Sequence, residues 1–219
     1  MTFDIGIVAH TSRAEAAADL AERTNAIYLS QDDGLLGCNI NHLKVWGWLA
    51  EHSDADWCVV LEDDAIVPVD IVSQMGKVLD AAPGDLVSLY RGHNVNNPAF
   101  ELNGLAAGVA ADDSGAHWVM GDHLLHAVGV ALRLSVICDM LAHVRLLPAN
   151  FPIDQGISHW SRGTAESKTQ TCYCWPSIVD HADGASAIGR HPDKLPRPKG
   201  RVAYRYGGRI AWNSEAVLL

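Results

Sequence analysis

The sequence of 219 residues has no long apolar run, no basic leader segment and no metal-finger spacing of its cysteines. Charged residues or histidines interrupt every apolar stretch well before the roughly 18–20 residues that a membrane span needs. The start, Met-Thr-Phe-Asp, places no basic segment ahead of an apolar one, so we expect no secretory signal and a cytoplasmic location. The five cysteines lie mostly among apolar residues, which indicates reduced thiols.

Positive charge is scarce overall but concentrated near the C-terminus. Sixteen Lys and Arg face 26 Asp and Glu, and the net charge of −10 by itself disfavours a polyanionic partner. Residues 190–209, however, hold seven basic residues and one Asp, a local charge of +6 that leaves −16 for the rest. With tyrosines interleaved, this segment suits phosphates of nucleic acid or of an anionic membrane; the alternative is a solvated tail that pairs with the acidic body. The acceptor or phosphate contacts that we single out are Arg190, Lys194, Arg197, Lys199 and Arg201.

The order of apolar segments predicts a single α/β domain. Composition, at 48% hydrophobic and 19% charged residues, fits one globular unit with an ample core. Residues 94–116, rich in Asn, Gly, Ala and Asp with weak periodicity, are expected to form a long loop or loose hairpin. From residue 190, prolines and glycines indicate an irregular tail. Strands are expected at 3–9, 26–29, 57–61, 85–90, 127–131 and 172–179, and helices at 14–23, 39–52, 68–82, 134–144 and 153–160.

The third expected strand stops at three consecutive acids, Glu62, Asp63 and Asp64. In open α/β sheets ligands bind at the carboxyl ends of strands. Three like charges there are costly unless a cation offsets them, and hard oxygen ligands suit Mg²⁺ or Mn²⁺ carrying phosphates. The alternative is a solvated turn in which Asp64 caps the next helix.

Several short blocks, in order over roughly residues 3–190, resemble glycosyltransferase family 25. They are residues 37–42 (Gly-Cys-Asn-Ile-Asn-His), 57–67 (an apolar strand and Glu-Asp-Asp), 127–132, 152–154 (Pro-Ile-Asp) and 176–188. Three departures stand out: Asn41 replaces the usual Ser, the third block lacks the usual Tyr, and His181 stands where the pattern has Gln. The collinear order makes the resemblance more specific than an acidic triplet alone.

This resemblance implies a GT-A fold, which is a mixed α/β sheet flanked by helices in one domain. The domain would cover residues 1–189, with a donor half at about 1–93 and an acceptor half at about 117–189, followed by the basic tail 190–219. The implied reaction is a metal-dependent, inverting transfer of a sugar from a nucleotide sugar, usually a UDP-sugar, to an acceptor hydroxyl. The implied cofactor is Mn²⁺ or Mg²⁺.

The resemblance also assigns roles to particular residues. Asp64 becomes the metal ligand, and Glu62 and Asp63 become donor contacts. His181 is either a further metal ligand or a surface histidine, and Asp154, at an expected helix start, is either the general base or a helix cap. The remaining donor-side candidates are Thr11, Arg13 and His42; for Arg13 the alternative is a surface charge, and for His42 it is packing beneath the site.

The acceptor is left open between two classes. One is a hydroxymethylated pyrimidine in DNA, as bacteriophage enzymes modify it; the basic tail slightly favours this class, and the location would then be the host cytoplasm. The other is a cell-surface or lipid-linked glycan. A metal-dependent phosphohydrolase or a non-catalytic nucleotide-sugar-binding module could use the same acidic strand end, and the oligomeric state is open.

Overall fold

A mixed sheet of eight strands forms the centre of the computed structural model, which describes residues 1–93, 98–163, 169–182 and 200–219. The strands are β1 (Phe3–His10), β2 (Tyr28–Asp32), β3 (Trp57–Glu62), β5 (Leu86–Ser88), β6 (Trp118–Gly121), β7 (Gly129–Arg133), β8 (Thr171–Cys174) and β10 (Ala216–Leu218). Their order across the sheet is β10-β6-β8-β5-β7-β3-β1-β2. A separate antiparallel ribbon pairs β4 (Ala65–Ile66) with β9 (Asp180–His181).

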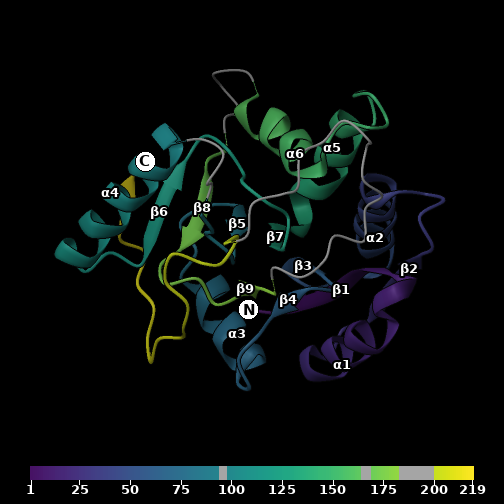
Figure 1. Ribbon diagram of the computed structural model, residues 1–219, viewed down its shortest axis with the longest axis horizontal. Coiled ribbons are helices and arrows are strands. Elements are labelled where there is room, and N and C mark those ends of the chain that lie inside the picture. Colours follow the sequence, from purple (N-terminus) through teal and green to yellow (C-terminus); the bar gives the residue numbers. More distant parts are fainter. Residues whose placement is uncertain (94–97, 164–168, 183–199) are drawn as a thin grey trace.

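Helices cover both faces of the sheet (Figure 1). They are α1 (Ala14–Thr24), α2 (Cys38–His52), α3 (Ile71–Asp80), α4 (Pro98–Ser114), α5 (Leu134–Val144) and α6 (Ile153–Arg162), with a short 3₁₀ turn η1 (Thr11–Arg13) before α1. On β3, Trp57, Val59 and Leu61 pack with α1 and α3, whereas Cys58 and Val60 pack with α2, α5 and α6. Burial on both faces explains the unbroken apolar run of this strand. The expected mixed α/β sheet flanked by helices is confirmed.

The strand directions bring distant segments to one edge of the sheet. β1, β2 and β3 are parallel, and β7 runs antiparallel between β3 and β5. Strand β8 is parallel to β5. The carboxyl ends of five strands and the start of β7 therefore lie along the same edge, which we call the carboxyl edge.

The prediction of a long loop or loose hairpin at residues 94–116 is wrong for the described residues of this range, because Pro98–Ser114 form α4. Ala107 and Ala111 are buried against the sheet, and glycines allow close approach. A Cβ at Gly108 would lie 2.5 Å from the ring of Trp175. Since small residues carry the packing face, the helix shows almost no hydrophobic periodicity in the sequence.

The described part of the tail packs on the body. β10 extends the sheet beside β6, and it is the one helix or strand within residues 200–219. The Tyr204 N–H donates to the Arg91 carbonyl at 3.0 Å. The domain boundary expected at residue 189 lies outside the described residues. Among the helices described, none combines the length and apolarity that a membrane span requires.

Candidate active site

The acidic triplet lies at the carboxyl edge, with Asp63 held between two parts of the β1 end. Its Oδ2 accepts the His10 N–H at 2.7 Å, and its Oδ1 accepts Arg13 Nη1 at 2.6 Å. Burial raises the pKa of Asp63 despite these two donors. Both carboxylate oxygens of Asp63 thus accept hydrogen bonds, and these bonds connect η1 and the end of β1 to the end of β3.

Arg13 bridges two of the three acids. Its Nη1 donates to Asp63 and also to Asp64 Oδ2 at 2.9 Å. Burial by itself lowers the pKa of the Arg13 guanidinium, but the two carboxylates outweigh this effect and raise it. Arg13 is therefore part of the site and is more than a charge on the surface of a helix.

Asp64 and His181, the two predicted metal ligands, lie side by side. His181 Nε2 is 3.4 Å from Asp64 Oδ2, and the Ala182 N–H donates to the Asp64 carbonyl at 2.9 Å. Burial by itself raises the pKa of Asp64, but the interactions with His181 and Arg13 outweigh this effect. The pKa is therefore lowered below its ordinary value, and the carboxyl is ionised at neutral pH. His181 is only 4% exposed. The β4–β9 ribbon, which sequence reasoning did not anticipate, produces this contact.

The second oxygen of Asp64 fits a cation. Oδ1 is buried and accepts no hydrogen bond from the described residues. A buried carboxylate oxygen without a donor is costly, and a bound cation removes that cost. Carboxylate and imidazole are both ligands that Mn²⁺ accepts, whereas Mg²⁺ prefers oxygen throughout.

Glu62, at the end of β3, contacts His42 on α2. His42 Nε2 lies 3.0 Å from Glu62 Oε1, and His42 is 1% exposed. Burial lowers the pKa of His42, but hydrogen bonding with Cys38 and Glu62 outweighs it and raises the pKa to about 10. His42 is thus positively charged at neutral pH, and its position favours the packing alternative over direct contact with a donor.

Asp154 lies in the first turn of α6, as predicted. Its Oδ1 accepts the Gln155 N–H at 2.9 Å, and its Oδ2 accepts the His126 N–H at 3.2 Å. The second contact ties the start of α6 to the segment before β7. The structure therefore places Asp154 beside the carboxyl edge, with its carboxylate fixed by two backbone donors.

His126 is a residue of this edge that sequence reasoning missed. Its backbone adopts a left-handed φ of 64°, and its ring lies edge-on to Tyr90 at 5.8 Å. The Tyr90 ring lies 6.3 Å from that of His181 on β9. The buried Nε2 of His126 has no partner among the described residues. No spacing signal marks this histidine, because its place follows from β7 starting beside the end of β3.

Several of the candidate residues affect the pKa of His126. Burial lowers its pKa, so the imidazole is neutral at pH 7. The carboxylates of Asp154 and Glu62 oppose this shift. Arg201 and His181 reinforce it. Residues from the expected donor half, acceptor half and tail therefore share one electrostatic environment.

Of the remaining predicted residues, Thr11 and Arg201 are described by the structure. Thr11 is exposed at the first position of η1. The backbone carbonyl of Arg201 accepts a hydrogen bond from the Tyr90 hydroxyl at 2.5 Å. The predictions for Arg190, Lys194, Arg197 and Lys199 lie outside the described residues.

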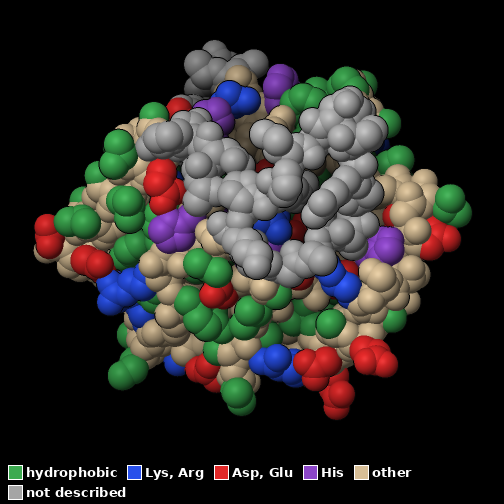
Figure 2. Space-filling view, in the orientation of Figure 1, with side chains coloured by type: hydrophobic (Ala, Val, Ile, Leu, Met, Phe, Trp, Pro, Cys, Tyr) green, Lys and Arg blue, Asp and Glu red, His purple; other side chains and the backbone are tan. Residues whose placement is uncertain are grey.

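Two further arginines of the tail pair within the chain. Arg205 forms an ion pair with Asp112 on α4, and Arg209 Nε donates to the Trp175 carbonyl at 2.9 Å. On the face shown in Figure 2, described Lys and Arg side chains are scattered among acidic ones. Arg205 thus pairs with an acidic residue of the body, and Arg209 is held by a backbone carbonyl.

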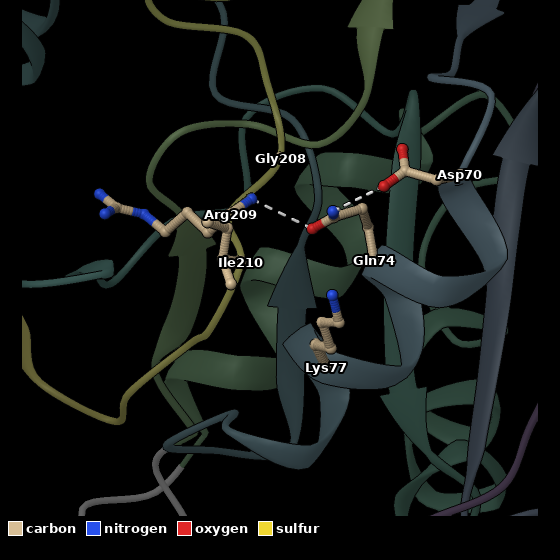
Figure 3. A pocket seen from close by; sticks show the side chains of 6 residues that line it. All are labelled: Asp70, Gln74, Lys77, Gly208, Arg209 and Ile210. Carbon is tan, nitrogen blue, oxygen red and sulfur yellow. Dashed lines mark hydrogen bonds between the residues drawn. The ribbon is translucent and has the colours of Figure 1, made fainter.

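Two cavities among the described residues have volumes of about 430 and 330 Å³. The larger is lined by Asp70, Gln74, Lys77, Gly208, Arg209 and Ile210 (Figure 3). There Gln74 Nε2 donates to Asp70 Oδ2 at 2.8 Å, and the Arg209 N–H donates to Gln74 Oε1 at 3.1 Å. This cavity is where the tail docks on α3. Neither cavity contains a predicted site residue.

No protein-family model and no curated protein sequence matches the chain, so membership of glycosyltransferase family 25 stays a prediction. Among solved structures, the chain is similar to mannosyltransferase PcManGT from Pyrobaculum calidifontis in complex with GDP-Man and Mn²⁺ (14% identity, TM-score 0.41), over 77% of this chain and 56% of that one. It is also similar to a glycosyltransferase involved in the glycosylation of the major capsid of PBCV-1 (9% identity, TM-score 0.44), over 84% and 95% of the two chains. Both likenesses are too distant to assign an activity, which must be argued from the site.

Proposed function

We propose that the protein is a metal-dependent glycosyltransferase that moves a sugar from a nucleotide sugar to an acceptor hydroxyl with inversion. The observation that carries the proposal is Asp64, which lies beside His181 with one buried oxygen lacking a donor among the described residues. Asp154 borders the same edge through its hydrogen bond with His126. Asp64 and His181 suit the binding of a cation that would activate the donor. Asp154, whose carboxylate is fixed at the same edge, suits removal of the proton from the acceptor hydroxyl.

On the donor side, Asp64 and His181 would hold Mn²⁺ or Mg²⁺. A bound cation there offsets the negative charge that develops on the departing diphosphate. Arg13 adds a second positive charge, and Asp63 orients it through the 2.6 Å contact. Glu62 presents its second carboxylate oxygen to a hydroxyl of the donor. The exposed Thr11 belongs to the same side, where η1 begins.

On the acceptor side, Asp154 is the general base. In an in-line displacement the acceptor oxygen bonds to the anomeric carbon while the bond to the diphosphate oxygen breaks, and the electron pair leaves with the diphosphate. Asp154 takes the proton of the acceptor hydroxyl. Its two backbone donors, Gln155 and His126, fix the carboxylate in place. Asp154 also lies in the first turn of α6, at the positive end of the helix dipole.

For the acceptor we retain the preference for a hydroxymethylated pyrimidine in DNA over a cell-surface or lipid-linked glycan. Its support is the +6 charge of residues 190–209. The proposed phosphate contacts within this range are Arg190, Lys194, Arg197, Lys199 and Arg201. Such contact weakens as salt increases.

The test is transfer of radiolabelled sugar from a panel of nucleotide sugars, with Mn²⁺, to hydroxymethylpyrimidine DNA and to oligosaccharides. Label on DNA supports the preferred acceptor, and label only on oligosaccharides excludes it. Release of phosphate or nucleotide that is the same with and without acceptor indicates a phosphohydrolase. Donor binding without turnover across the panel indicates a binding module. Asp64→Ala should abolish transfer, whereas Asp113→Ala, an exposed acid on α4, should leave it unchanged.

A further inference from the structure

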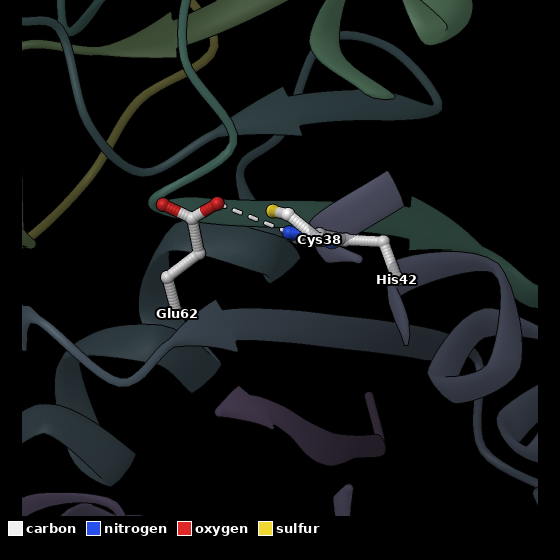
Figure 4. A group of neighbouring side chains, drawn as sticks. All are labelled: Cys38, His42 and Glu62. Atoms are coloured by element: carbon white, nitrogen blue, oxygen red, sulfur yellow. Dashed lines mark hydrogen bonds and ion pairs between the residues drawn. The ribbon is translucent and has the colours of Figure 1, made fainter. Parts of the chain in front are cut away.

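Three side chains of different chemistry meet beneath the carboxyl edge. Cys38 opens α2, His42 follows one helical turn later, and Glu62 ends β3. One ligand atom from each lies within 4.8 Å of the other two, and His42 Nε2 is 3.0 Å from Glu62 Oε1. Figure 4 shows the sulfur, the imidazole nitrogen and the carboxylate oxygen converging on one point. We call these residues the Cys38 cluster.

A thiolate, an imidazole and a carboxylate are the ligand types that zinc takes in proteins. At bond lengths of about 2.0–2.3 Å, tetrahedral ligand atoms are about 3.3–3.8 Å apart, so small side-chain rotations would complete the geometry. Cys38 and His42 are four residues apart on a helix and therefore point to the same side. His42 is buried, while Cys38 and Glu62 are partly exposed, which gives a cation access from solvent.

We propose that the Cys38 cluster binds a thiophilic divalent cation such as Zn²⁺, at a site distinct from the one formed by Asp64 and His181. The cation replaces the protons of the thiol and the imidazole, and its fourth position is open to water. Mn²⁺ and Mg²⁺ prefer oxygen ligands and bind thiolates weakly. The two sites therefore select different metals.

A consequence follows for the reaction, and it rests on the proposed function. Glu62 is the proposed contact for a donor hydroxyl through its second oxygen, and a cation bound to Oε1 draws negative charge away from that oxygen. Zn²⁺ should therefore weaken donor binding even when Mn²⁺ is present in excess.

The binding test uses Co²⁺, whose coordination by a thiolate gives a charge-transfer absorption in the near ultraviolet. Co²⁺ added to the full chain should produce this band, Zn²⁺ should remove it by competition, and Cys38→Ser should not show it. Cys138→Ser is the matched control, because Cys138 is an exposed free thiol on α5, and it should retain the band. Absence of the band in the unchanged protein, or its persistence in Cys38→Ser, overturns the proposal.

A second variant tests the carboxylate ligand. Glu62→Gln preserves shape and should weaken Co²⁺ binding by at least about tenfold. Unchanged Co²⁺ affinity in this variant would exclude the three-residue site. Since absorption is measured without nucleotide sugar, failure of the proposed transferase activity does not affect this readout. Failure of the Co²⁺ band likewise leaves the transferase proposal standing.

Discussion

Replacing either of the adjacent acids Asp63 and Asp64 by alanine should have different effects: the first change should lower stability, and the second should abolish stabilisation by Mn²⁺. Asp63→Ala leaves the His10 N–H without its acceptor, which costs about 1–3 kcal/mol. It also removes one carboxylate from Arg13, whose side chain is 23% exposed, for about another 0.5–1 kcal/mol. A loss of about 1.5–4 kcal/mol lowers the Tm of a chain of this size by about 3–16 °C.

Asp64→Ala should change stability by no more than about 1 kcal/mol. Arg13 keeps its contact with Asp63, and the substitution also deletes the buried Oδ1 that has no donor among the described residues. What this variant should lose is stabilisation by Mn²⁺. A cation at about 100 times its Kd adds about 2.7 kcal/mol to the free energy of unfolding of the unchanged protein.

The assay is thermal unfolding followed by circular dichroism, with and without Mn²⁺. Asp63→Ala should unfold at a lower temperature, and Asp64→Ala should unfold near the Tm of the unchanged protein with no Mn²⁺-dependent rise. Asp113→Ala should match the unchanged protein in both respects. A full Mn²⁺-dependent rise in Asp64→Ala would refute the metal assignment. Equal stability of the Asp63 and Asp64 variants would refute the structural role of Asp63.

Four further predictions concern other parts of the molecule. Asp154→Asn should lower the transfer rate by about 10²–10⁴-fold while thermal shift with the donor is retained, because only the base is lost. Asparagine tolerates the left-handed backbone of residue 126, so His126→Asn should preserve the fold. In steady-state kinetics this variant should have a kcat several-fold lower and an unchanged affinity for the donor. Gly108→Leu should reduce the urea-measured free energy of unfolding by about 1–3 kcal/mol, because its side chain meets a tryptophan ring. The pKa of His42 is raised from 6.5 to about 10, so its stabilisation is complete below pH 6.5 and is lost as pH approaches 10. The decline in unfolding free energy over this range should be shallower in Glu62→Gln, and equal slopes in the two proteins would exclude this pair as its source.

The elements that could be predicted are those whose sequence has a clear period or an unbroken apolar run. β3 was recognisable because both of its faces are buried, and α5 because its apolar residues recur at helical spacing. α4 has no such pattern, since alanine and glycine pack where larger side chains usually would. β6 and β10 are too short to show alternation, and their pairing depends on the fold around them.

The same contrast applies to the candidate site. The acids of the triplet could be singled out because they follow an apolar strand in the chain itself. His126 could not be singled out, and neither could the meeting of Cys38 and His42 with Glu62, because their neighbours come from distant segments. The Glu62 N–H donates to the Val128 carbonyl at 3.0 Å, and this contact exists only once β7 lies beside β3. A left-handed histidine before a strand carries no periodic signal.

The charge of the acid triplet, finally, is partly neutralised by the chain itself. Sequence reasoning took three adjacent carboxylates as a charge excess that calls for a cation. In the structure Glu62 lies against a protonated His42, Asp63 binds Arg13, and Asp64 shares that arginine. Each acid therefore contacts a positive side chain of the chain, although Asp63 and Asp64 share one arginine. Among the described residues, Oδ1 of Asp64 is the one buried carboxylate oxygen of the triplet without a hydrogen-bond partner, and this is the atom to which we propose that the cation of the reaction binds.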